Sequence, residues 1–304
     1  MTTTGSFPFA RKGTMRLTFG AGIAILAVFG LVPAVAVLVI SFTDITGLPG
    51  IPIDWIGLRN YLEFFSAAHL GDNLNALRNT VVFAGVSTVV QVVGGLLIAV
   101  LLNQRLRGRT LYRAIVFMPT VLGVTVIGLI WSLIFNPSGG PGASVLALFG
   151  THSAFFGDPN LALGLVIFVQ IWAGLGISVV IFLAGLQAIP DELYEAAALD
   201  GASGWQRLRL VTVPVLAPSI TTNVLLGIVN AMQSYQLAYV LTGSANRATQ
   251  LLSTLIYVQG FGGTGGGVAE SQGYAASISI VQFVLVGVVS LIALRILRRR
   301  EARL

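Results

Sequence analysis

The 304-residue chain contains no cysteine, and charged residues make up only 9% of it, against about a quarter in ordinary soluble domains. Without cysteine it can form neither disulfides nor thiolate metal sites. Hydrophobic residues make up 55% of the chain, and its mean hydropathy is +0.89. A water-facing surface cannot hold so many apolar side chains, so most of the chain is expected to face lipid or other helices.

Six apolar runs are long enough to cross a bilayer, which takes roughly 20 helical residues. They cover residues 17–42, 79–103, 114–135, 161–188, 215–242 and 274–297. The first follows basic residues, as a secretory signal would, but its 26 residues exceed the signal core of about 7–15. We therefore expect a retained first span and an all-α integral membrane fold with six transmembrane helices. Pro33 and Pro119 are expected to kink their helices locally.

The spans are also free of ionisable residues. No Asp, Glu, Lys, Arg or His occurs in them before Arg295, at the inner end of the last span. A carrier driven by an ion gradient is expected to keep such residues inside its spans. The single lysine, Lys12, is followed by Gly13, so a phosphate-binding loop ending in Gly-Lys-Ser/Thr is impossible. The chain therefore has the residues neither of an ion-coupled carrier nor of a subunit that hydrolyses ATP itself.

The basic residues are distributed unevenly along the chain. With both termini in the cytoplasm, 14 of the 17 basic residues lie on the cytoplasmic side, and only Arg59, Arg78 and Arg247 lie outside. This bias is what the positive-inside rule requires. We therefore predict a multi-pass protein of the cell membrane, with residues 1–16 and a basic tail at 298–304 in the cytoplasm. The net charge of +6 then indicates contact with lipid headgroups and not with nucleic acid.

The outward connections are 43–78, 136–160 and 243–273. In the second, glycine and proline at 136–142 precede an apolar patch at 145–149, which predicts a short interfacial helix. The glycine-rich stretch 262–267 in the third indicates a flexible tether.

Two histidines, His69 and His152, lie in the outward connections, with Asp72 and Asp158 not far along the chain. Histidines so far apart are typical of solvated surface, so we expect no metal site. No polar cluster that could be catalytic is visible either, which argues against a membrane enzyme.

One inward connection, residues 189–213, is long and charged; we call it the coupling segment. It contains Glu195-Ala-Ala-Ala-Leu-Asp-Gly-Ala202, and Pro214 follows thirteen residues beyond Gly201. Residues 191–199 predict a short helix with acids in its first turn, and Gly201 is expected to end it. Ser203 can cap a second short helix through Leu210. We expect two short helices at an angle along the inner membrane surface.

The run from Pro190 to Trp205, followed by Val213-Pro214, resembles the EAA motif of permease subunits in ATP-driven, binding-protein-dependent importers. The resemblance covers about residues 15–297 and is to the sugar-type branch of maltose, glycerol-phosphate and oligosaccharide permeases, of the first-permease type. Residues 244–246 depart from the Gly-x-Pro that usually follows Thr-Gly in that family.

The resemblance implies a type I ABC importer permease fold, with its core at 79–297. It also implies that the coupling segment docks into a groove on the ATPase subunit, through Glu195, Ala196, Ala197, Asp200, Gly201, Ala202 and Arg207. The implied partners are a second permease, two copies of an ABC ATPase subunit that bind ATP and magnesium, and an extracytoplasmic substrate-binding protein. The chain itself would bind no cofactor and catalyse no reaction. The alternative is a self-sufficient, ion-coupled secondary carrier.

Polar and small residues form a stripe on two of the spans. Asn223, Gly227, Asn230 and Ser234 share one face of the fifth span, and Gln170, Gly174 and Ser178 share one face of the fourth. In the family that the chain resembles, substrate binds between these spans, which carries pocket positions onto Ala173, Ile177 and Ala231 as well. The predicted substrate-pathway residues are Gln170, Trp172, Gly174, Ile177, Gly227, Asn230, Ser234 and Tyr235. The alternative is that these residues serve helix packing in the bilayer.

Overall fold

The computed structural model describes residues 12–48, 50–104, 107–244, 246–262 and 271–301. Within these ranges the chain is helical, apart from turns, loops and one isolated β-bridge between Thr43 and Trp55. Four helices are long and apolar enough to cross a membrane, and two bent helix pairs bring the number to six if each pair counts as one span. The all-α, membrane-spanning fold expected from the sequence is therefore confirmed.

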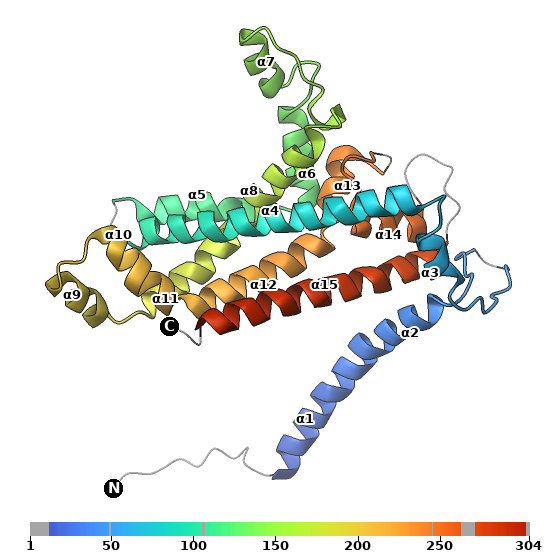
Figure 1. Cartoon of the computed structure of the whole chain (residues 1–304), viewed down its shortest axis with the longest axis horizontal. Coiled ribbons are helices and arrows are strands. Elements are labelled where there is room, and N and C mark those ends of the chain that lie inside the picture. The colour runs from blue at the N-terminus through green and yellow to red at the C-terminus, as the bar shows by residue number, and fades with distance from the viewer. Residues whose placement is uncertain (1–11, 49, 105–106, 245, 263–270, 302–304) are drawn as a thin grey trace.

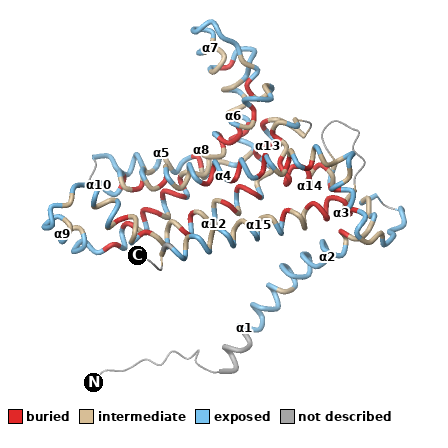
Figure 2. Tube along the Cα trace, viewed as in Figure 1, coloured by how far each residue is buried: buried red, intermediate tan, exposed pale blue. Residues whose placement is uncertain are grey.

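The first span runs through α1 (Lys12–Leu26), a π-helical turn η1 (Ala27–Leu31) and α2 (Val32–Ile40). The π turn lies just before Pro33, because proline offers no N–H and its ring would clash with the preceding turn of a regular helix. This span leaves the helical bundle at an angle (Figure 1). The apolar window within it is 0% buried by the rest of the chain, so lipid or another subunit must cover it (Figure 2).

Two long helices form the centre of the bundle. Helix α4 (Leu70–Asn103) begins nine residues before the predicted second span, so the outward connection that precedes it is shorter than expected. It packs along α8 (Ala162–Gln187) and against α12 (Ala217–Gln233). Phe83, Val166 and Met232, one from each helix, are almost completely buried where the three meet.

The third span is broken. Helix α5 (Arg109–Val121) meets α6 (Val124–Ile134) at an angle of 102°, with Leu122 and Gly123 between them. The expected single span at 114–135 with a local kink was therefore wrong. Pro119 restricts the turn that precedes it, and Gly123 lies four residues further along the chain. The helix therefore ends here instead of bending.

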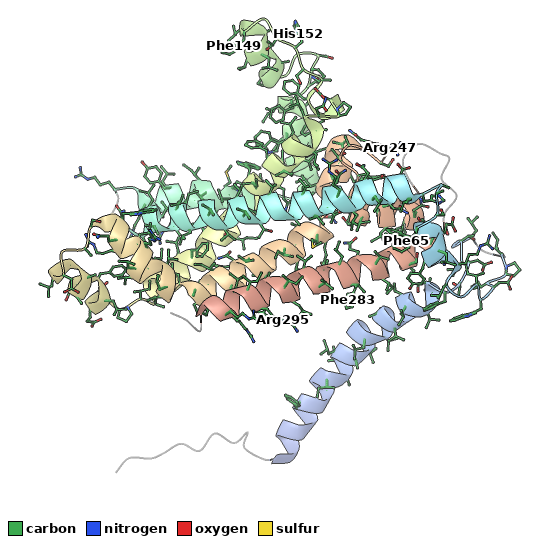
Figure 3. The ribbon with its side chains drawn as sticks, viewed as in Figure 1. Phe65, Phe149, His152, Arg247, Phe283 and Arg295 are labelled. Carbon is green, nitrogen blue, oxygen red and sulfur yellow. The ribbon has the colours of Figure 1, made fainter. Side chains whose placement is uncertain are left out.

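The C-terminal half of this span, α6, leads into an arm that projects from the bundle (Figure 1). It continues through α7 (Pro141–Leu148) and a 3-10 turn η2 (Phe155–Gly157), and Figure 3 shows Phe149 and His152 near its tip. A short helix was predicted here, and α7 contains most of the apolar patch. Leu148 and Phe149 are 83% and 77% exposed.

The fifth span is also broken. Helix α12 ends at Gln233, Ser234 and Tyr235 leave the helix, and α13 (Gln236–Thr242) follows. The prediction of one continuous helix over 215–242 was wrong in this respect. Helix α13 packs against α6 so closely that a β-carbon on Gly128 would clash with Val240. The C-terminal halves of the two broken spans therefore pack together.

The outward connection 243–273 contains a further helix that was not expected, α14 (Leu252–Phe261). It is too short to span a bilayer and packs against α15 (Gln272–Glu301), the last span. Of the predicted glycine-rich tether, residues 263–267 lie outside the described residues. The short helix α3 (Arg59–Phe64) lies beside the outer end of α15, and Asn60 donates hydrogen bonds to the carbonyls of Ser41 and Thr43.

Candidate functional site

The coupling segment lies at one end of the bundle, opposite α3 and α14 (Figure 1). Helix α9 (Asp191–Leu199) forms as predicted and ends at Gly201, whose φ is +75°. The amides of Gly201 and Ala202 donate to the carbonyls of Ala198 at 3.1 Å and Ala197 at 2.9 Å. This pair of bonds is a Schellman motif, which needs a left-handed residue that glycine adopts without strain.

The second helix is capped as predicted. The amide of Ser203 donates to the side-chain oxygen of Gln206 at 2.7 Å, and the amide of Gln206 donates back to Ser203 Oγ at 3.4 Å. The helical stretch that begins with α10 (Gly204–Arg207) does not end at Leu210, however. It continues through a π turn η3 (Leu208–Thr212) and α11 (Val213–Val215), and then bends by 70° into α12.

The segment is held together by a contact between its two parts and presents a largely exposed surface. The Tyr194 hydroxyl lies 3.0 Å from Thr212 Oγ1, which ties α9 to η3. Leu199 is 90% exposed and Trp205 68% exposed. Among the predicted coupling residues, Glu195, Ala196, Asp200 and Gly201 are exposed, while Ala197, Ala202 and Arg207 are partly buried. The segment therefore exposes a surface that is partly apolar and partly acidic.

Two neighbouring cavities lie between the long helices. The first, of about 380 Å³, lies where α5, α6, α8, α12 and α13 meet, and the second, of about 310 Å³, lies between α4, α8 and α12. Gln170, Gly174 and Ile177 of α8 and Asn230 of α12 line both cavities. The stripes predicted on the fourth and fifth spans therefore converge. Neither wall contains Asp, Glu, Lys, Arg or His.

The break between α12 and α13 brings two further predicted residues to the first cavity. Ser234 Oγ lies 3.5 Å from Gln170 Oε1, and Tyr235 lines the wall with its ring stacked on Tyr257 of α14, the ring centroids 4.9 Å apart. Gly227 lines only the second cavity.

Two residues considered from the sequence lie away from these walls. Trp172 lines neither cavity, and its ring meets Trp131 of α6 edge-on, with centroids 5.4 Å apart. Ala231 is only 2% exposed and belongs to the hydrophobic core.

Several predicted pathway residues also hold helices together. A β-carbon on Gly227 would lie 2.9 Å from Thr88 Cγ2 of α4, so the glycine permits close approach of the two helices. Ser178 Oγ donates to Asn223 Oδ1 at 3.0 Å, and both side chains are buried between α8 and α12. Residues that line the cavities therefore also serve helix packing along these stripes.

Sequence reasoning missed Gln91, on α4. Its Nε2 atom donates to the backbone carbonyl of Gln170 at 2.9 Å, and its side chain covers Gly174, where a β-carbon would clash with it. Gln91 also lines the second cavity. The available signal was that it is the one glutamine in the apolar run 79–103, since a long polar side chain in a span is costly unless it is partnered or functional.

Comparison with known proteins identifies the family. Over residues 91–303 the sequence matches the family described as binding-protein-dependent transport system inner membrane component. The chain belongs to this family. The permease is 32% identical over 262 residues to the multiple sugar-binding transport system permease protein MsmF of Streptococcus mutans, which covers 86% of this chain and 87% of that protein. It is 33% identical over 285 residues to the trehalose/maltose transport system permease protein MalF of Thermococcus litoralis, which covers 92% of each.

The permease also has the fold of a solved importer. A chain of the bacterial ABC transporter that imports the acidic polysaccharide alginate superimposes with a TM-score of 0.80, over 96% of this chain and 97% of that chain, at 22% identity. The permease is therefore a membrane subunit of an ABC importer, and such subunits are not themselves catalytic. The alternative of a self-sufficient, ion-coupled carrier does not fit this family.

The two histidines of the permease lie far apart in the structure. His69 precedes α4, and its ring centroid lies 5.8 Å from that of Tyr274, whereas His152 lies on the projecting arm (Figure 3). The described residues contain no group of three or more His, Asp or Glu that could hold a metal ion.

Proposed function

We propose that the permease forms half of the translocation pathway for a neutral, polyhydroxylated solute such as a sugar or an oligosaccharide. The observation that carries this proposal is the composition of the two cavity walls, which hold amides, hydroxyls and a tyrosine but no charged group. Amides and hydroxyls can exchange hydrogen bonds with sugar hydroxyls, and an aromatic ring offers an apolar face to a pyranose. The names of the relatives, which include sugar and trehalose/maltose transport permeases, support the same class of substrate.

The proposed assembly contains a second, related permease and two copies of an ATPase subunit, which bind ATP and Mg²⁺. An extracytoplasmic binding protein delivers the solute. The coupling segment contacts the ATPase from the cytoplasm, where the charge bias of 14 in 17 basic residues also places both termini. Glu195 and Asp200 are exposed there and can form charge-assisted hydrogen bonds at the edge of the contact.

Only a short stretch of chain connects the coupling segment to the helix that lines the proposed pathway. Closure of the two ATPase subunits would move α9 and α10, and the bond between Tyr194 and Thr212 would carry that movement to η3 and α11. Helix α12 follows directly, and it carries Asn230 at the cavity walls. The mechanism is therefore alternating access, in which movement of the coupling segment tilts α12 and so displaces one wall of the pathway.

Reconstitution tests this function. The complex is purified through a tag on the permease and placed in proteoliposomes, and uptake of labelled maltose, trehalose and a maltodextrin is measured with and without ATP. We expect uptake of a neutral sugar only with ATP and with the co-purified subunits. Uptake by the permease alone under an ion gradient, or import of charged solutes only, would contradict the proposal.

A matched pair of variants tests the cavity itself. Asn230→Leu removes an amide from both walls and should reduce uptake at least about tenfold while the complex still assembles, because a buried sugar hydroxyl would lose its partner. Thr222→Ala is the control, since Thr222 is an exposed residue of the same helix whose hydroxyl donates to the Pro218 carbonyl. Equal uptake by the two variants would argue against a substrate path through these cavities.

A further inference from the structure

The break between α12 and α13 has no local cause in the sequence. From Ile228 to Thr242 the chain contains neither proline nor glycine, the residues that usually interrupt a transmembrane helix. The break in the third span is different, because Pro119 and Gly123 flank it. Contacts from other helices must therefore hold the fifth span open at Ser234 and Tyr235.

Two such contacts reach backbone carbonyls at the break. Gln282 Nε2 of α15 donates to the Met232 carbonyl at 2.8 Å, and Ser253 Oγ of α14 donates to the Ser234 carbonyl at 2.9 Å. Carbonyls at the end of a helix lack intrahelical partners, and inside a membrane protein a carbonyl that is left unsatisfied destabilises the fold. The two donors supply what the interrupted helix loses.

Both donors are buried, and neither lines the two pathway cavities. Gln282 is 7% exposed and Ser253 is 6% exposed. A third contact, the stacking of Tyr257 on Tyr235, comes from the same helix as Ser253. Helices α14 and α15 thus contact the break on the side away from the two cavities, while its other side faces Gln170.

We propose that Gln282 and Ser253 are positioning residues that hold the fifth span broken and so place Ser234 and Tyr235 on the pathway wall. The pathway role rests on the function proposed above, but the positioning itself does not. Without the two donors, a regular helix would satisfy the Met232 carbonyl through the amide of Gln236, four residues on. Ser234 and Tyr235 would then rotate away from their present positions.

A cross-linking experiment tests the positioning. The chain has no cysteine, so Gln170→Cys and Ser234→Cys introduce the only two thiols of the permease. The full chain is produced with its partner subunits, and its membranes are treated with a short bifunctional methanethiosulfonate. The loss of free thiols is then counted by a gel shift with polyethylene-glycol maleimide. Neither substitution removes a backbone carbonyl that the argument uses.

On this background, Gln282→Leu and Ser253→Ala should each slow cross-linking by up to about fivefold, because losing one hydrogen bond changes a two-state equilibrium constant by about that factor. Ser253→Thr keeps the hydroxyl and should retain the rate. Ser279→Ala is the matched control, because Ser279 lies on α15 near Gln282 but donates to the Ala275 carbonyl of its own helix at 2.9 Å.

Unchanged cross-linking in both Gln282→Leu and Ser253→Ala would overturn the proposal, and so would an equal loss in Ser279→Ala. If Gln282→Leu does not reach the membrane, the pair Ser253→Ala and Ser253→Thr decides the matter alone. The cross-link needs no substrate. Failure of the wild-type complex to import maltose, trehalose or maltodextrin would therefore count against the proposed function and leave the positioning result standing.

Discussion

Gln91 Nε2 donates to the backbone carbonyl of Gln170 at 2.9 Å, across the interface between α4 and α8. Gln170 is one of four residues that line both cavities, so a residue on a third helix fixes the part of α8 that the two cavities share. The same side chain covers Gly174, one turn further along. The side-chain amide of Gln91 therefore both joins α4 to α8 and shapes the wall of the second cavity.

Replacement of Gly174 by alanine should disturb this amide. The added β-carbon would clash with Gln91, which must move and so lose its bond to Gln170. We expect uptake of the transported sugar to fall at least about fivefold, the effect of losing one hydrogen bond, with the permease still present in the membrane. Gly164→Ala, on the same helix but with open space around it, is the control. Equal uptake by the two variants would count against the arrangement.

Replacement of Gly201 should act through the backbone and not through a clash. No atom lies within 4 Å of the position of a β-carbon there, but φ is +75°, which costs a residue with a β-carbon about 1–2 kcal/mol. Gly201→Val should leave assembly largely intact and abolish both uptake and substrate-stimulated ATP hydrolysis. Gly201→Asn, which tolerates this conformation better, should recover part of the activity.

The control for Gly201 lies three residues away. Gly204 also has open space around it, but its φ is not in the left-handed region, so Gly204→Ala should transport normally. Normal transport by Gly201→Val would refute the role of this turn in coupling.

Removal of the Tyr194 hydroxyl should loosen α9 from η3. Tyr194→Phe loses the contact with Thr212, worth about 1 kcal/mol, while the ring keeps its packing against the bundle. We expect basal ATP hydrolysis to be retained and its stimulation by the loaded binding protein to fall. The two rates, measured on the same reconstituted complex, provide the check. A parallel change in both would indicate a general loss of docking.

Asn79 should matter more for stability than the nearby ion pair between Asp72 and Arg247. Asn79 is buried, and its Nδ2 donates to the carbonyls of Ala248 and Gln250, each at 3.1 Å. Asn79→Leu leaves two partly buried carbonyls without this donor, at a cost of about 1–3 kcal/mol. Arg247→Ala removes a pair whose side chains are 71% and 45% exposed, worth at most about 1 kcal/mol. Thermal unfolding of the purified complex should show the larger fall in Tm for Asn79→Leu.

Local signals in the sequence were sufficient for the two caps of the coupling segment. The cap at Ser203 and the left-handed stop at Gly201 form where they were predicted, because both depend on side-chain and backbone chemistry within a few residues. The end of the second short helix was misplaced. Nothing within the segment stops it at Leu210, and α11 continues until the chain bends into α12.

Helical periodicity correctly brought Gln170, Gly174, Asn230 and Ser234 toward a common space, but it placed Trp172 there as well. Trp172 lies about half a turn from Gln170 along α8 and packs on Trp131. A stripe of polar residues shows which face of a helix is unusual. It does not show which neighbour that face meets, and Gln91 was missed for this reason.

The sequence by itself determined the membrane location, the helical class and the caps of the coupling segment. These follow from hydropathy, the absence of charge in the spans and residues that act on their immediate neighbours. Only the tertiary structure decided where the fifth span breaks, how α14 packs and which residues line the cavities. The physical reason is clearest at Ser234, where the helix is interrupted because Gln282 and Ser253, distant in sequence, satisfy the carbonyls at the break.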